Sequence, residues 1–311
     1  MELDFRAEKQ QKGQTLQDTP TRRAIAPPVY RFPDFLCIGA HKSGTSWLDQ
    51  NLRNHPSIYL PPIKELQYFN ELYIEQARRW STKARTQKST GALKRHVRNK
   101  MPKDWDYAYI AQLSAIASGT LCDDWYGRIF AYAAPDQVCG EISSDYFLLP
   151  EEGIAHAIGL SPALKVLFLM RDPIDRSWSH MRMTMRNRGI DDLEILKGYA
   201  EDSDTVLRAD YPAAVAKWGA QVGHERLLPV FTDDIAAAPL AVLEKICAFL
   251  GVGFDRALFP KAAEPVHVGQ DLEIPPTVYD ILKVQLRPVY ERIARLYPET
   301  GAGWMARHYR R

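Results

Sequence analysis

The fold of this chain is decided by the stretch FLCIGAHKSGTSWL, residues 35–48. Residues 35–38 are apolar and predict a buried strand, residues 39–44 form a turn bounded by glycines, and a helix is predicted to begin at Thr45. Together these elements make a cradle for phosphate, because the backbone N–H groups of the turn and the helix N-terminus point at the anion. The alternative is a plain glycine-containing turn of an α/β protein.

The glycines of this loop have the spacing found in nucleoside-triphosphate loops, G-x-x-x-x-G-K-[ST], where the Lys binds phosphate and the last hydroxyl binds Mg²⁺. In this chain Gly39 and Gly44 keep the spacing, but Thr45 stands at the position of that Lys, and the lysine of the loop is Lys42. The loop therefore keeps the backbone cradle for phosphate, but its lysine reaches the phosphate from a different position than in nucleoside-triphosphate loops. We therefore expect a phosphate-bearing ligand other than ATP with Mg²⁺; a nucleotide kinase or NTPase with an unusual loop is the alternative.

Composition predicts an ordinary globular protein. The chain has 311 residues, of which 46% are hydrophobic and 25% charged, and a net charge of +2 gives no reason to expect a nucleic-acid partner. The four cysteines are scattered without a C-x-x-C pair, so neither a metal site nor a disulfide framework is predicted. No apolar run approaches the roughly 20 residues of a transmembrane helix, and the N-terminus does not resemble a leader. We expect a cytoplasmic protein without a transmembrane segment.

The rest of the chain alternates between predicted strands and predicted helices. Strands are predicted at 35–40, 138–142, 164–170 and 227–231, with a short extended piece at 58–62. Helices are predicted over 45–54, 151–160, from Pro173 onward, and over 203–222, 239–250 and 276–296. This alternation predicts the α/β class, a parallel sheet flanked by helices. Residues 1–30 are polar and are interpreted as a mobile tail before a single domain at 31–311.

A second polar cluster follows the strand predicted over 164–170. This strand ends at Arg171, and Ser179 follows eight residues later on the predicted helix. Ligands of such sheets bind at the carboxyl ends of strands, and an arginine fork and a serine hydroxyl can converge on one phosphate. Taken alone, this arginine is better explained by an ordinary ion pair with Asp172 or Asp175 than by phosphate binding.

Taken together, the two clusters resemble the sulfotransferase family, which uses 3′-phosphoadenosine 5′-phosphosulfate (PAPS). The family's loop K-S-G-T-[ST]-W matches residues 42–47, and its second motif, an apolar strand, R-D-P and a Ser eight residues after the Arg, matches residues 166–179. The similarity extends through GEISSDY at 140–146 and spans roughly residues 34–252. It implies a P-loop-like three-layer fold and in-line transfer of a sulfuryl group from PAPS to an acceptor hydroxyl. A non-catalytic protein that binds the desulfated donor, PAP, is a further alternative.

The resemblance also implies roles for individual residues in the grip on the donor. Lys42 would stabilise charge on the bridging or leaving phosphate oxygen, and Trp47 would stack on adenine or pack in the core. The other residues implied to contact PAPS are Ser43, Gly44, Thr45 and Ser46, whose backbone N–H groups would bind the 5′-phosphate, and Arg171 and Ser179, which would bind the 3′-phosphate. No metal is needed by this reaction.

The run KELQYF at 64–69 resembles K-E-P-H-F-F of the carbohydrate branch of the family, in which the Glu is the proposed base. Glu65 is therefore the candidate base, and a carbohydrate or another small-molecule or lipid alcohol is the expected acceptor. The R-K-G run of the cytosolic phenol and steroid branch is not found. The alternative is that Glu65 merely pairs with Lys64. The next candidate bases are then His180 and His267, although a structural role explains His180 more simply than a catalytic one.

The segment from 78 to 103 is strongly basic, with ten Lys and Arg residues and no Asp or Glu. We interpret the region around 76–104 as a helical insertion with solvated charges. The alternative is a surface that attracts an anionic acceptor or membrane headgroups. Trp80 is the segment's one aromatic residue, so base stacking and nucleic-acid binding are not expected.

Overall fold

The computed structural model describes residues 30–190, 192–266 and 272–309. The polar tail predicted at residues 1–30 therefore lies outside the described residues except for Tyr30, and the candidate base His267 lies outside them as well.

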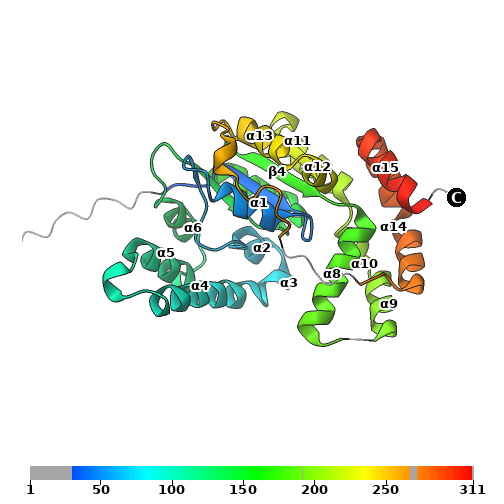
Figure 1. Cartoon of the computed structure of the whole chain (residues 1–311), viewed down its shortest axis with the longest axis horizontal. Coiled ribbons are helices and arrows are strands. Elements are labelled where there is room, and N and C mark those ends of the chain that lie inside the picture. The colour runs from blue at the N-terminus through cyan, green and yellow to red at the C-terminus, as the bar shows by residue number, and fades with distance from the viewer. Residues whose placement is uncertain (1–29, 191, 267–271, 310–311) are drawn as a thin grey trace, which may run out of the picture.

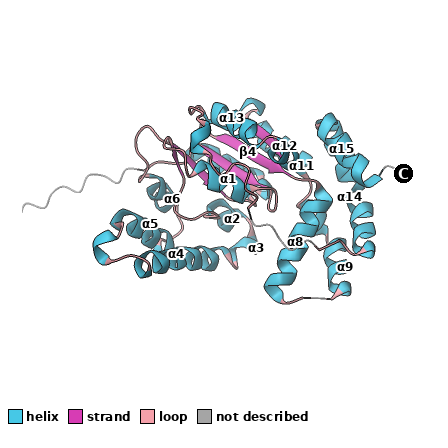
Figure 2. Cartoon of the chain, in the orientation of Figure 1, coloured by secondary structure: helices cyan, strands magenta, loops and turns pink. Residues whose placement is uncertain are grey.

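A parallel sheet forms the centre of the described part of the chain (Figures 1 and 2). Its strands lie in the order β2-β3-β1-β4-β5, and each neighbouring pair is parallel. Their bounds are β1 (Phe35–Gly39), β2 (Ile58–Tyr59), β3 (Val138–Ile142), β4 (Lys165–Met170) and β5 (Leu227–Phe231). The predicted α/β class with a parallel sheet is confirmed.

Helices cover both faces of this sheet, which gives three layers. Alternate residues of a strand point to opposite faces, so in β1 Phe35 and Cys37 pack against the helices α1 (Thr45–Leu52) and α13 (Pro239–Leu250). Leu36 and Ile38 join the core on the other face. That core is covered by α2 (Tyr68–Tyr73), α6 (Asp123–Phe130), α7 (Glu151–Leu160), α8 (Pro173–Arg188), α11 (Tyr211–Val222) and α14 (Pro276–Leu296).

Several helices lie outside the three central layers (Figure 1). On one side of the sheet, α4 (Ser81–Arg98) follows α3 (Glu75–Arg78) and packs against α5 (Tyr107–Ser118). On the other side, α9 (Leu193–Glu201) and α15 (Pro298–Tyr309) pack against α14. A short helix, α12 (Thr232–Ala237), follows β5. No helix in the described ranges is long and apolar enough to cross a membrane.

The single helix predicted over residues 203–222 is wrong, because the structure divides it into α10 (Ser203–Leu207) and α11. Pro212 lies in the first turn of α11, where its missing N–H costs nothing, whereas inside a longer helix it would remove a hydrogen bond. The carboxylate of Asp210 accepts a hydrogen bond from the N–H of Ala213 and caps the new helix.

Most of the basic segment forms α4, and the charges of the segment are not all solvated. Arg85 is 3% exposed, and its Nη1 atom donates to the carbonyl of Leu66 at 3.0 Å and to Glu71 at 2.8 Å. Its guanidinium also lies 4.8 Å from the ring centroid of Trp125. Arg85 therefore attaches α4 to the body of the protein, while Lys83, Lys94, Arg95 and Arg98 are exposed.

Candidate functional site

The loop between β1 and α1 has the backbone geometry of a tight turn around a ligand. Gly39, Lys42 and Gly44 have positive φ angles of 147°, 73° and 90°. A Cβ atom on Gly39 would lie 2.5 Å from the carbonyl oxygen of Ser144, so only glycine fits there. The N–H of Ala40 donates to the carbonyl of Leu169 at 2.6 Å, which holds the loop against the end of β4.

The helix that follows presents its N-terminus at the end of this loop. Gly44 is the N-cap of α1, and glycine has no side chain with which to satisfy the first N–H groups of a helix. These donors and the positive end of the helix dipole are therefore left to a ligand. An anion with several oxygens is the ligand that suits such a site.

The two motifs predicted from the sequence meet at this end of the sheet. Lys42 is partly buried, and burial followed by the charges of Arg186 and Arg171 holds its pKa below the ordinary value. Arg182 and Lys64 act on Lys42 in the same direction. We call these five side chains the cationic cluster. Two of the five have a carboxylate nearby, Arg171 with Asp175 at 3.9 Å and Lys64 with Glu65 at 3.7 Å. The positive charges outnumber these two carboxylates, so a ligand with several negative charges suits the cluster.

The other predicted donor contacts lie on the same elements. Ser179 is partly buried on α8, and Ser43 and Thr45 are buried in the loop and in the first turn of α1. Trp47 is 5% exposed, and its Nε1 atom donates to the carbonyl of Ala262 at 2.7 Å. Of the two roles that the sequence left open for Trp47, packing in the core fits this position.

Lys64 is a residue of the site that the sequence analysis treated only as a partner of Glu65. Its ammonium donates to the hydroxyls of Thr45 at 2.9 Å and Ser46 at 3.0 Å. Lys64 therefore fixes the hydroxyls of the loop and adds a second positive charge beside Lys42. The signal in the sequence was its place in the KELQYF run, but only the tertiary structure shows which hydroxyls it reaches.

Glu65 is held next to this loop by several independent contacts. Its N–H donates to the carbonyl of Ile142 at 3.0 Å, and its φ angle of 66° is unusual for a residue with a side chain. Its carboxylate accepts hydrogen bonds from the N–H of Ser144 at 2.9 Å and from the Ser144 hydroxyl. Gln67 Nε2 donates to it at 2.7 Å, and Lys64 lies 3.7 Å away. Both candidate roles, base and ion-pair partner, are compatible with this position.

A buried carboxylate lies behind Glu65 and supports the same serine pair. Glu141 is 1% exposed and accepts hydrogen bonds from Tyr126 OH at 2.5 Å and from Tyr146 OH at 2.8 Å. It also accepts from the hydroxyl of Ser143 at 2.5 Å. Ser143 thus binds Glu141 while its neighbour Ser144 binds Glu65, so the end of β3 connects the two carboxylates.

We expect Glu141 to lower the stability of the protein as the pH rises from about 5 to about 7. Burial raises the pKa of Glu141 from 4.5 to about 7, so the unfolded chain loses this proton before the folded chain does, and unfolding becomes easier. Glu141→Gln removes this titration and should flatten the pH dependence of the unfolding free energy. Urea unfolding across this range measures the slope; equal slopes for wild type and variant would contradict the expectation.

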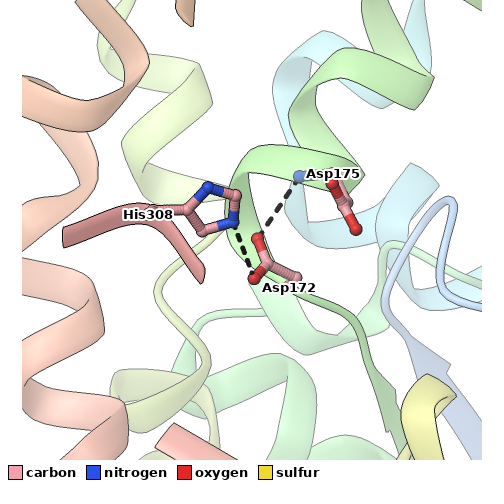
Figure 3. Close-up of side chains that lie close together, drawn as sticks. All are labelled: Asp172, Asp175 and His308. Carbon is pink, nitrogen blue, oxygen red and sulfur yellow. Dashed lines mark hydrogen bonds and ion pairs between the residues drawn. The ribbon is translucent and has the colours of Figure 1, made fainter. Parts of the chain in front are cut away.

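Asp172 of the R-D-P motif connects the start of α8 to the C-terminal helix (Figure 3). Its buried carboxylate accepts hydrogen bonds from the N–H groups of Ile174 at 3.1 Å and Asp175 at 3.4 Å. Tyr290 OH donates to the same carboxylate, and His308 Nε2 lies 3.0 Å from it. These contacts fix α8, and with it Arg171, against α14 and α15. Nothing in the sequence pattern indicated His308.

Asp172, Asp175 and His308 are also the group of possible metal ligands found among the described residues, with ligand atoms within 4.8 Å of one another. Figure 3 shows the imidazole of His308 directed at Asp172, with the carboxylate of Asp175 on the other side. The oxygens of Asp172 already accept hydrogen bonds from helix N–H groups and from Tyr290. We therefore assign the group a structural role, as a cap of α8.

His180, the alternative base, lies against His41 of the loop with their ring centroids 5.2 Å apart. Burial, together with His41 and Arg176, lowers the pKa of His180 to about 3, and burial lowers that of His41 to about 4. Both imidazoles are therefore neutral at pH 7, and a group with such a low pKa is a weak base. This favours a structural role for His180.

Comparison with known proteins places these features in one family. The sequence model of the sulfotransferase family matches residues 33–256, more than half of the chain. No curated protein matches the chain in sequence.

Solved structures with a similar fold include a sulfotransferase from Alicyclobacillus acidocaldarius, with 24% identity and a TM-score of 0.64. The match covers 89% of this chain and 99% of that one. The sulfotransferase domain from the curacin biosynthetic pathway matches with 16% identity and a TM-score of 0.50 over 83% of this chain and 99% of that domain. At these identities the likeness concerns the fold.

Proposed function

The chain belongs to the sulfotransferase family, and on this premise we propose that it transfers a sulfuryl group from PAPS to the hydroxyl of an acceptor. The observation that carries the proposal is the cationic cluster, in which Arg171 of the second motif acts on Lys42 of the loop. PAPS carries a phosphosulfate at one end of its nucleoside and a phosphate at the other. Two anionic ends need two sets of cations and donors, and both motifs are required to supply them.

The donor would be held along the loop and the start of α8. The N–H groups at the start of α1 would bind the 5′-phosphate, as helix N-termini bind anions. Arg171 and Ser179 would bind the 3′-phosphate, the arginine through its two-pronged guanidinium. Lys42 would neutralise the charge that develops on the phosphate oxygen as the sulfuryl group departs. Lys64, bonded to the hydroxyls of Thr45 and Ser46, would support this lysine.

The acceptor would approach from the side of Glu65. Its hydroxyl must lose a proton during transfer, and Glu65 would accept that proton. The contacts from Ser144 and Gln67 orient the carboxylate, so little freedom is lost when an acceptor binds. Similarity to the carbohydrate branch suggests a carbohydrate or another small-molecule alcohol as the acceptor.

The experiment that tests the proposal is an acceptor screen with radiolabelled PAPS. Wild-type protein is incubated with pools of sugars, phenols, sterols and peptides, and labelled products are separated by chromatography. We expect wild type to transfer label to a hydroxyl compound in at least one pool, and Lys42→Ala to transfer at least about 10²-fold less. Tight binding of PAP without transfer to any pool would contradict the proposed reaction and favour a binding protein.

Arg171→Ala should weaken the binding of a ligand that carries the 3′-phosphate more than the binding of a ligand that lacks it. We expect PAP to bind at least 10-fold more weakly, because losing one charge-assisted pair costs on the order of 2 kcal/mol. Adenosine 5′-phosphosulfate lacks the 3′-phosphate and should lose much less. Calorimetric titration of wild type and variant with both ligands measures the difference. Equal losses for both would place Arg171 away from the 3′-phosphate.

A further inference from the structure

Lys88 brings the basic helix α4 into contact with the proposed active site. Its ammonium donates to the backbone carbonyl of Lys64 at 3.5 Å. Burial lowers the pKa of Lys88, the negative charge of Glu65 raises it, and the charge of Lys64 lowers it again. The ammonium of Lys88 therefore lies close to the candidate base and to the lysine that holds the donor loop.

Arg95 extends this positive charge along the same face of α4. Residues 88, 91 and 95 are three and four positions apart and so share one face of the helix. A Cβ atom built on Gly91 would lie 3.6 Å from Nη1 of Arg95, so the guanidinium folds back over the glycine toward Lys88, as helical side chains do.

The charges of this face are not balanced within the described part of the chain. The ion pairs of the segment are those of Arg79 with Glu75 and of Arg85 with Glu71. Among the described residues, Lys88 and Arg95 have no carboxylate within 4.0 Å. Arg85 and the packing of α4 against α5 attach this helix to the protein, and no ion pair of Lys88 or Arg95 contributes to that attachment among the described residues.

We propose that the acceptor is an acidic alcohol whose carboxylate, sulfate or phosphate group binds Lys88 and Arg95 while its hydroxyl reaches Glu65. This inference rests on the proposed sulfuryl transfer and names the class of its acceptor. Lys88 sets the specificity because it adjoins the base, and its positive charge offsets the repulsion between Glu65 and an anionic group beside the reacting hydroxyl. A neutral alcohol would leave both cations without an anionic partner.

The geometry favours a soluble acceptor over a membrane surface. A helix that lies in a membrane interface needs a large apolar face turned outward. The exposed residues of α4 are instead all polar or charged, namely Thr82, Lys83, Gln87, Lys88, Lys94, Arg95 and Arg98. Lys88 is exposed, but its ammonium bends back to donate to the carbonyl of Lys64.

Binding of a fluorescent sulfated dextran oligosaccharide, followed by anisotropy at saturating PAP, tests this proposal. The variants are Lys88→Gln and Arg95→Gln, and the matched control is Lys83→Gln. Lys83 is exposed on α4, but it lies five residues from Lys88 and therefore on another face. We expect Lys88→Gln to weaken binding about 10-fold or more, Arg95→Gln to weaken it less, and Lys83→Gln to change it less than about twofold.

Three results would overturn the proposal. One is equal weakening by all three substitutions, which indicates attraction by net charge alone. Another is equal binding of neutral dextran. The third is binding to phosphatidylserine vesicles that depends on Lys88 when the oligosaccharide does not bind, which indicates a membrane surface. PAP titration of the same samples shows which proposal has failed. Without PAP binding by wild type the proposed function itself fails, whereas PAP binding together with any of these three results overturns the acidic acceptor alone.

Discussion

Lys42→Ala should reduce sulfuryl transfer by at least about 10²-fold, because it removes the charge that is matched to the departing phosphate oxygen. Lys42 lies in a tight loop with a φ angle of 73°, and burial and neighbouring cations lower its pKa. A lysine surrounded by like charges does not stabilise the folded state by its charge. Its removal should therefore leave the fold intact, and it should lower kcat much more than it lowers the affinity for PAP.

Single-turnover transfer from radiolabelled PAPS measures this loss, and thermal unfolding monitored by circular dichroism shows whether the variant is folded. Lys83→Ala is a matched control, since it removes a lysine from the exposed surface of α4. Transfer by Lys42→Ala within a few-fold of wild type would contradict the role of Lys42.

Glu65→Gln should lower kcat by roughly 10²-fold or more while the affinity for PAP stays nearly unchanged. Glutamine keeps the shape of the side chain and can still accept the hydrogen bond from the N–H of Ser144, but it cannot take a proton from the acceptor. Steady-state kinetics at several pH values, together with calorimetry of PAP, separate the two roles that this residue could have.

A parallel fall of kcat and PAP affinity would assign Glu65 to the ordering of Lys64 and the loop. The base would then have to be sought elsewhere, although the pKa of about 3 for His180 makes that residue a weak candidate. Ser144→Ala provides a useful companion variant, because it removes one donor to the carboxylate without touching the carboxylate itself. It should lower kcat by a smaller factor than Glu65→Gln.

Local sequence patterns were sufficient to predict the centre of the fold. β1 and β4 are continuous apolar runs, which is the pattern of strands that are covered on both faces. The glycines of the loop and Pro173 at the start of α8 indicated where these strands end. The break before α11 also has a local signal, Asp210 followed by Pro212, which outweighs the amphipathic periodicity of residues 203–222.

The parts of the site that could not be predicted depend on contacts between distant segments. Lys64 reaches the hydroxyls of residues 45 and 46 only because the extended segment after β2 returns along the sheet. His308 reaches Asp172 over a separation of 136 residues. Lys88 approaches Lys64 from a helix whose composition indicated only a charged surface. Residue types reveal such charges, but only packing of the chain shows which ones meet.

Calorimetric titration with PAP and with ATP·Mg²⁺ tests the central claim most directly. The claim is that the loop at 39–44, the start of α1 and Arg171 form one site for a 3′-phosphorylated adenine nucleotide without a metal. The account predicts that PAP binds at least 10-fold more tightly than ATP·Mg²⁺ and that Mg²⁺ does not improve the binding of PAP. Tighter binding of ATP·Mg²⁺, or binding of PAP that depends on Mg²⁺, would contradict it.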